Sequence, residues 1–234
     1  AANDYTKSLD ETFAAPDVLK LYDVINVHTY AQLPEAPGRS PWARSFPEDP
    51  VLDYLRDVDE TAAWRDRKAP GKAIWITEFG WDACTPEAMK KRTGWFEKLD
   101  WKGVTDLQQA QYLVRSFFLF AERRIDRAYI YYYDDNDEPS VHAAAGLTRK
   151  FQPKPAYWAV KHLQATLGDH RFHRVVQQKP GDLCVSEFTP GGGTAGKIWA
   201  VWSPTGSGRE QEVTLSGLPQ LPLKIERMPT VEGD

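Results

Sequence analysis

The sequence predicts an α/β fold that is followed by a small antiparallel β domain. Apolar strands alternate with amphipathic helices in the first part of the chain, and helices of about 12 or more residues between strands imply parallel pairing. In each unit the longer loop follows the strand, as in an α/β barrel. Short strand-like runs take over after Gly168. We therefore predict a partial barrel at residues 1–168 and a β-sandwich domain at residues 169–234.

The elements of the predicted barrel part follow from their residue patterns. Strands are expected at residues 21–30, 73–79 and 128–133, where β-branched, aromatic and other apolar residues run together. Helices are expected at residues 50–68, 106–124 and 155–167, where apolar residues recur every three to four positions. Pro50 suits a first helical turn, and Gly168 ends the last helix. Because such apolar strands are typical of sheets covered on both sides, we expect both faces of this sheet to be buried.

The β domain is predicted from short runs in which apolar and polar residues alternate. KIWAVW and EVTL show this alternation most clearly, and Pro, Gly and Ser turns separate the runs. Alternation of this kind indicates antiparallel strands with one buried face. We expect strands at residues 172–176, 183–188, 197–202, 212–215 and 223–228.

Composition argues against two large classes of function. The 234 residues carry a net charge of −4, so no basic surface favours nucleic acid. No apolar run approaches the roughly 20 residues of a membrane-spanning helix. The N-terminal stretch AANDYTKSLDETF lacks the charged-then-apolar order of a signal peptide. Neither a nucleic-acid partner nor a membrane span is therefore expected.

Polar and aromatic side chains stand at the ends of the three predicted barrel strands. Glu78 lies at the end of the second strand, although burying a carboxylate costs free energy unless it is hydrogen-bonded or used. In the first strand His28 and Tyr30 share a face, and the third strand ends in tyrosines and aspartates. Because the carboxyl ends of barrel strands meet at one rim, these side chains predict a lined pocket there.

The segments VINVHTY, WITEFGW and AYIYYYDDND, followed by GLTRKFQPKPAYWAVKHL, resemble the last three strands of a clan A glycoside hydrolase barrel. Family 39 and its relatives are the most similar in style. The resemblance covers roughly residues 20–168, and the β domain only loosely. It implies that the chain holds strands 6–8 of a (β/α)8 TIM barrel, the C-terminal portion of such an enzyme.

The resemblance also implies roles for particular residues. Glu78 falls on the catalytic nucleophile at the end of the seventh strand, and His28 and Tyr30 match a His-x-Tyr pair on the sixth. Tyr132 takes the place of an aromatic residue, often Trp, that lines the sugar site in the eighth. The residues themselves allow Tyr30 to donate a hydrogen bond to Glu78 and His28 to bind a sugar hydroxyl. Trp81 and Trp42 are candidates for stacking on a sugar face.

This reading predicts a retaining O-glycoside hydrolase that acts on a β-linked glycan or exopolysaccharide without a cofactor or a metal. Such an enzyme needs a second carboxyl group about 5–5.5 Å from the nucleophile. In the clan the acid/base Glu follows an Asn, but the sequence contains no Asn-Glu pair and fewer strands than a closed barrel needs. We therefore expect the acid to lie outside the chain, and the N-terminal half of the barrel to be a separate chain or a missing segment. For such a protein we expect a secreted or periplasmic location.

Two other functions fit parts of the sequence. A barrel relative that has lost its acid would be a non-catalytic carbohydrate-binding protein. A metal-dependent hydrolase could use His28 with the acidic run at residues 134–137, but no HxH or HExxH spacing is present. The same run lacks the spaced ligand set of a Ca²⁺ loop, so a solvated charge run is the simpler interpretation.

Overall fold

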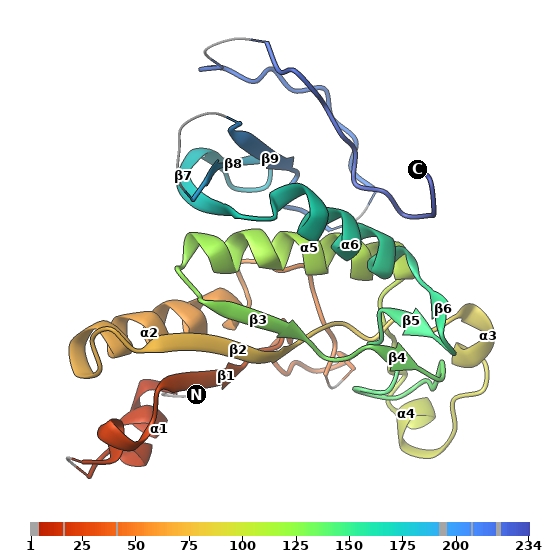
Figure 1. Cartoon of the computed structure of the whole chain (residues 1–234). Helices are drawn as coiled ribbons and strands as arrows, with labels where there is room; N and C mark the ends of the chain where they lie inside the picture. The colour runs from red at the N-terminus through yellow and green to blue at the C-terminus, as the bar shows by residue number, and fades with distance from the viewer. Residues whose placement is uncertain (1–4, 16, 41, 192–195, 207, 219–220) are drawn as a thin grey trace.

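The computed structural model of the chain describes residues 5–15, 17–40, 42–191, 196–206, 208–218 and 221–234. Strands and helices alternate in the first part of the chain (Figure 1). Their order is α1 (Tyr5–Thr12), the 3-10 helix η1 (Val18–Leu21), β1 (Val24–His28), α2 (Tyr54–Lys68), β2 (Ala73–Phe79), α3 (Pro86–Met89), α4 (Gly94–Lys98), α5 (Asp106–Glu122) and β3 (Arg127–Ile130). Then follow β4 (Asp134–Asp135), β5 (Thr148–Arg149), β6 (Gln152–Pro153), α6 (Pro155–Leu167), β7 (His170–Lys179), β8 (Leu183–Pro190) and β9 (Ile198–Trp202).

The three predicted barrel strands form one parallel sheet in the order β1–β2–β3. Helix α2 lies in the crossover from β1 to β2, and α5 in the crossover from β2 to β3. The start of α5 is set by a capping box, in which Thr105 and Gln108 each accept a hydrogen bond from the other's backbone N–H. The predicted α/β fold with parallel pairing is therefore confirmed. None of the described helices is both long and apolar enough to cross a membrane.

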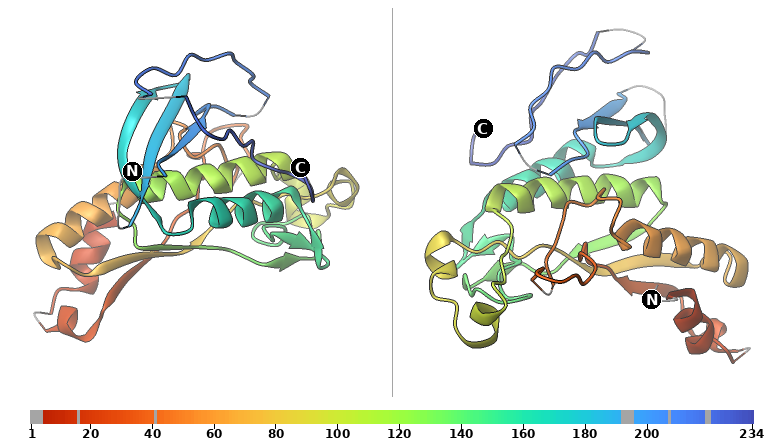
Figure 2. Two further views of the ribbon diagram at one scale, coloured as in Figure 1. Left: turned by 45° about the horizontal axis from the view of Figure 1, so that its top comes forward. Right: turned by 180° about the vertical axis from the view of Figure 1, so that it is seen from behind.

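Helices cover one face of this sheet. Ile25 and Val27 of β1 and Ile74 and Ile76 of β2 are buried on that face, among apolar side chains of α1, α2 and α5. Helices α5 and α6 pack against each other and lie between this sheet and the sheet of β7–β9 (Figures 1 and 2). The main core is therefore the layer between the parallel sheet and the helices.

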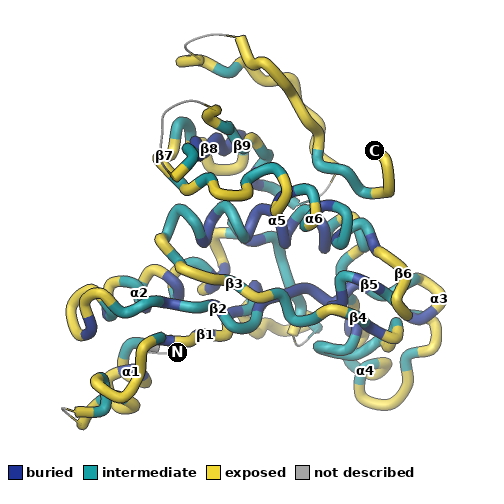
Figure 3. The backbone as a smooth tube through the Cα atoms, in the orientation of Figure 1, coloured by how far each residue is buried: buried dark blue, intermediate teal, exposed yellow. Residues whose placement is uncertain are grey.

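The opposite face of the sheet is open in the described part of the chain, so the prediction that both faces are buried is wrong. Residues on that face are half-buried or exposed, in alternation with the core positions (Figure 3); they include Asn26, His28, Trp75, Arg127 and Tyr129. The rings of Trp75 and Tyr129 lie 5.9 Å apart, and the Arg127 guanidinium lies 5.1 Å from the Trp75 ring. The strands are apolar enough to be buried on both faces, but the described helices pack against only one face.

Strands β7, β8 and β9 form an antiparallel sheet that packs on α5. Phe118 of α5 lies 5.7 Å from Phe188 and 5.3 Å from Trp202, measured between ring centroids. The predicted strands at residues 212–215 and 223–228 are wrong, because these residues form no strand. Their alternating apolar side chains do not pack against a sheet within the described chain, and Leu223 is 97% exposed. The predicted β-sandwich is accordingly not confirmed, since the sheet packs on a helix.

A buried ion pair joins the loop after β1, helix α5 and the segment after β9. Arg115 of α5 forms a bidentate pair with Glu48, and both side chains are mostly buried. The Trp202 indole N–H donates to Glu48 at 2.7 Å, and Arg115 donates to the Thr205 carbonyl at 2.8 Å. We call these four residues the Glu48 junction. It ties the loop at residues 31–50 to α5 and to the end of β9.

Candidate active site

A shift in strand register places Glu78 beside the open face of the sheet. Strict alternation along β2 would put Glu78 on the side of Ile74 and Ile76, inside the helix-covered core. The pairings of β2 with both neighbours are irregular at this point, after Val27 in β1 and after Ile76 in β2, as at a β-bulge. Phe79 therefore takes a core position, and the Glu78 side chain keeps 31% of its surface exposed.

Tyr30 and His28 flank the Glu78 carboxylate from the end of the neighbouring strand. The Tyr30 hydroxyl donates a hydrogen bond of 2.9 Å to Oε2 of Glu78. Nδ1 of His28 lies 3.4 Å from the same oxygen, and half of the His28 side chain is exposed. His28 is the register partner of Glu78, which explains why the two side chains meet. The structure thus brings together the three residues that the sequence placed at the strand ends.

Two further side chains contact the ring of Tyr30. The Arg44 guanidinium lies 4.2 Å from the ring centroid, and the His142 imidazole packs edge-on at 4.6 Å. Burial raises the pKa of Tyr30 above its ordinary value, and the hydrogen bond and charge of Glu78 act in the same direction. The phenol therefore stays protonated and remains a donor at neutral pH. Burial and, to a smaller extent, the charge of Arg44 lower the pKa of His142. This imidazole is therefore neutral at neutral pH.

Asp82 fixes the loop that carries His142. The backbone N–H groups of His142 and Ala144 donate to the buried Asp82 carboxylate at 3.0 and 3.2 Å. Gly80 is required where the ends of β2 and β3 approach each other, because a Cβ there would lie 2.7 Å from the Tyr131 carbonyl oxygen. Gly80 and Asp82 therefore hold the end of β3 and the segment that carries His142 close to the end of β2.

The acidic run at residues 134–137 is engaged by protein donors. Its three carboxylates accept hydrogen bonds from hydroxyl, amide and ammonium groups: Thr148 to Asp134, Gly146 and Lys154 to Asp135, and Thr85 to Asp137. Lys154 is almost fully buried at the start of α6. Among the described residues, no group of three or more His, Cys, Asp or Glu side chains is placed to hold a metal ion. The carboxylates of this run therefore hold their loop against the start of α6. This arrangement does not support the metal-dependent hydrolase that the sequence left open.

Trp81 is a core residue, so its predicted role as a sugar-stacking surface is corrected. Only 1% of Trp81 is exposed. Its indole N–H donates to the Ser45 carbonyl at 2.8 Å, and its ring packs against Tyr54 and Tyr112. No ring face is left for a sugar. Trp81 anchors the loop at residues 31–50, which carries Arg44.

Trp42 and Tyr132 are more accessible than Trp81, but neither contacts the Glu78 carboxylate through a hydrogen bond in the described part of the chain. Trp42 is 38% exposed in the loop at residues 31–50. Burial raises the pKa of Tyr132 to about 12, and its ring packs against that of Tyr131 at 4.8 Å. Within the described ranges, neither forms a hydrogen bond or a ring contact with Glu78 or Tyr30. Their roles as substrate contacts stay predictions.

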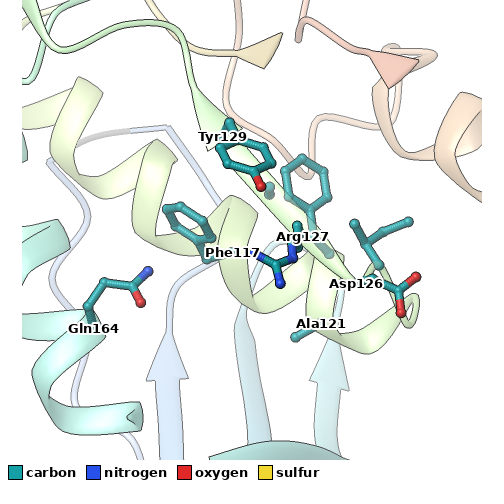
Figure 4. Close-up of a pocket in the computed structure, with 9 residues that line it drawn as sticks. Phe117, Ala121, Asp126, Arg127, Tyr129 and Gln164 are labelled. Carbon is teal, nitrogen blue, oxygen red and sulfur yellow. The ribbon is translucent and has the colours of Figure 1, made fainter. Parts of the chain in front are cut away.

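A cavity of about 350 Å³ lies elsewhere, along the outer edge of β3 (Figure 4). Residues of α5, β3 and α6 line it, among them Phe117, Ala121, Arg127, Tyr129 and Gln164. In the described chain β3 pairs only with β2, so this edge carries unpaired backbone groups. None of the candidate site residues lines the cavity.

Sequence reasoning missed Arg44, Asp82 and His142. Arg44 and His142 lie in loops, where no hydrophobic period indicates which side chains face inward. Asp82 could have been predicted from the sequence, because it is a second acidic residue shortly after the end of the strand that carries Glu78. The contacts of these residues depend on how two loops fold over the rim, and a single sequence does not encode that in a readable pattern.

Comparison with solved structures finds proteins of similar fold. The chain aligns over 79% of its length with a family 39 glycoside hydrolase from the gut symbiont Bacteroides cellulosilyticus WH2, at 19% identity and a TM-score of 0.54. This chain is similar in fold to part of a family 39 glycoside hydrolase. It spans 34% of the length of that protein. The predicted resemblance is therefore confirmed at the level of the fold.

Two structures of a Bacteroides uniformis β-glucuronidase also match, at 14% identity and a TM-score of 0.40, over 88% of this chain and 25% of theirs. One of them is described as β-glucuronidase 2 covalently bound to cyclophellitol-6-carboxylate aziridine. No family profile and no curated protein sequence matches the chain.

Proposed function

We propose that this chain carries the catalytic nucleophile, Glu78, of a retaining O-glycoside hydrolase that acts on a β-linked glycan or exopolysaccharide. The observation that supports this most is the hydrogen bond from the Tyr30 hydroxyl to Glu78, a partly exposed carboxylate at a strand end. The fold similarity to part of a family 39 glycoside hydrolase points in the same direction.

In the proposed reaction an ionised Glu78 oxygen forms a bond to the anomeric carbon while the bond from that carbon to the leaving oxygen breaks. A general acid gives its proton to the leaving oxygen. In the second step the same residue takes a proton from water, and the water oxygen displaces Glu78 from the sugar. Two displacements at one carbon give retention. Tyr30 orients the carboxylate and stabilises its negative charge before the attack.

The accessible residues around Glu78 form the proposed sugar site. Half of the His28 side chain is exposed beside the carboxylate, where it binds a sugar hydroxyl. Trp42 offers a partly exposed indole for stacking on a sugar face, and Tyr132 lines the site from the end of β3. No cofactor is required for these steps. A secreted or periplasmic location stays a prediction.

The proposal requires a further segment that supplies the general acid and the remaining strands. The outer edges of β1 and β3 are unpaired within the described residues, and the face that carries His28 and Tyr129 is open. The cavity beside β3 offers apolar side chains of α5 to an added parallel strand. The segment is either another part of the same polypeptide or a second chain.

The chain by itself is expected not to behave as a well-folded monomer of 26.6 kDa. Open strand edges and an uncovered sheet face favour association, and a three-stranded parallel sheet buries little surface on its own. Native mass spectrometry and a thermal melt would measure this, with a denaturing gel for the chain mass. A monomer that melts in a single cooperative transition would contradict the need for a partner segment.

Trapping the covalent intermediate tests the function directly. The chain, together with the segment that completes the barrel, is exposed to slow fluorinated aryl β-glycosides. Mass spectrometry is expected to find one sugar on the peptide that contains Glu78, because the intermediate is an ester of the nucleophile. NMR of the first product is expected to show the anomer of the substrate. A label on another carboxylate, or an inverted product, would contradict the proposal. Sugar binding without label or turnover would favour the non-catalytic carbohydrate-binding alternative.

A further inference from the structure

We propose that Arg44 is a positioning residue that acts on Glu78 through Tyr30, and that Arg44 and His142 together clamp the Tyr30 ring. This inference rests on the proposed function. The clamp joins two loops, because Arg44 belongs to the loop between β1 and α2 and His142 to the loop between β4 and β5. Neither the Arg44 nor the His142 side chain forms a hydrogen bond with Glu78 in the described part of the chain; both contact the tyrosine that does.

The geometry of the Tyr30 ring supports the clamp. A guanidinium 4.2 Å from the ring centroid is at cation–π distance, and the His142 ring lies 4.6 Å away at an interplanar angle of 68°. Rotation of the ring would break these contacts and move the hydroxyl from its 2.9 Å hydrogen bond. The two contacts therefore fix the donor that faces the carboxylate.

Arg44 is held in this place at some cost. Its Nη1 is enclosed by protein and has no hydrogen-bond partner among the described residues. Leaving a buried donor unsatisfied is unfavourable, and burial also lowers the pKa of Arg44, while the nearby charge of Asp82 opposes that shift. The Tyr30 ring is the contact that compensates. Because Nη1 is enclosed, this nitrogen is not open to an anionic sugar group.

The charge of Arg44 also acts on the phenol. Burial and Glu78 raise the pKa of Tyr30, and Arg44 opposes them. A phenol with a less elevated pKa is a better hydrogen-bond donor to a carboxylate, so Arg44 strengthens the bond that orients Glu78. The same charge acts on His142, whose pKa also depends on burial, Asp82 and Glu78.

A double-mutant cycle tests whether Arg44 acts through Tyr30. In the complete enzyme, Arg44→Met is expected to lower kcat about tenfold to a hundredfold with little change in KM, and Arg44→Lys to restore part of it. In a Tyr30→Phe background, Arg44→Met is expected to cause no further loss, because its target hydroxyl is gone. Arg39→Met is the matched control, since Arg39 is exposed in the same loop and its side chain donates to the Pro34 carbonyl. Thermal melts of all variants verify folding.

Three outcomes overturn the proposal: an unchanged kcat in Arg44→Met, an equal loss in the Tyr30→Phe background, or a rise in KM alone, which would indicate direct substrate binding.

A second readout needs no turnover. The chain has five histidines, and His142 is assigned in NMR spectra by its absence from a His142→Gln variant. Between about pH 5 and pH 8, Arg44→Met is expected to raise the pKa of His142, because a neighbouring positive charge is removed.

The two readouts separate this proposal from the proposed function. If no glycoside is hydrolysed by the wild-type enzyme, the proposed function fails, and the His142 titration alone decides the clamp. A pKa of His142 that is the same in wild type and Arg44→Met would then overturn the clamp. A rise in Arg44→Met but not in Arg39→Met would support it.

Discussion

Replacing Glu78 with glutamine is expected to reduce turnover at least about a thousandfold, because an amide can neither carry the negative charge nor form the glycosyl ester. The side chains have nearly the same shape, and the amide oxygen still accepts the hydrogen bond from Tyr30. Folding is therefore expected to stay intact. Initial rates on a panel of chromogenic β-glycosides measure the loss, and a melt of the same samples verifies folding.

The matched control for this substitution is Glu87→Gln, which changes an exposed glutamate in the first turn of α3. It is expected to leave turnover unchanged. If Glu78→Gln kept most of its activity, Glu78 would not be the nucleophile. If the wild-type enzyme bound glycans but hydrolysed none of the panel, the non-catalytic alternative would replace the proposed activity.

Trp81→Ala is expected to destabilise the fold by about 3–5 kcal/mol, as truncations of buried tryptophans do. The substitution leaves a cavity between Tyr54 and Tyr112 and removes the hydrogen bond to the Ser45 carbonyl. Trp81→Phe fills part of the cavity and is expected to cost less. Denaturant unfolding of the complete protein measures both losses.

Trp95→Ala provides the comparison for Trp81, because Trp95 lies in the short helix α4 and is 60% exposed. Its effect is expected to stay within about 0.5 kcal/mol. An unchanged unfolding midpoint in Trp81→Ala, together with a raised KM, would return Trp81 to the sugar-stacking role that the structure argues against.

The regular elements of the first part of the chain are predictable because their signals are local. The 3.6-residue period marks α5, and the β-branched run marks β2, so the parallel order follows from connection length. The meeting of Tyr30, His28 and Glu78 also follows, because the carboxyl ends of parallel strands lie at one edge.

The remaining features depend on contacts between distant residues. Strict alternation would bury Glu78, and only the register shift in β2 places it beside His28. Trp81 follows the strand end, as a rim residue would, yet it turns into the core toward Tyr54. The run around Leu223 alternates like a strand but finds no neighbour to pair with in the described chain. Neither periodicity nor propensity reports these outcomes.

The Glu48 junction has a consequence for any attempt to shorten or recombine this protein. Removing the C-terminal strands at the predicted boundary near residue 168 would strip Glu48 of the Trp202 donor and Arg115 of the Thr205 acceptor. A buried ion pair that loses such partners is costly to keep enclosed. The loop that it restrains also carries Arg44, which contacts Tyr30. A chimera cut at that boundary would therefore disturb the surroundings of the carboxylate without altering any residue that touches it.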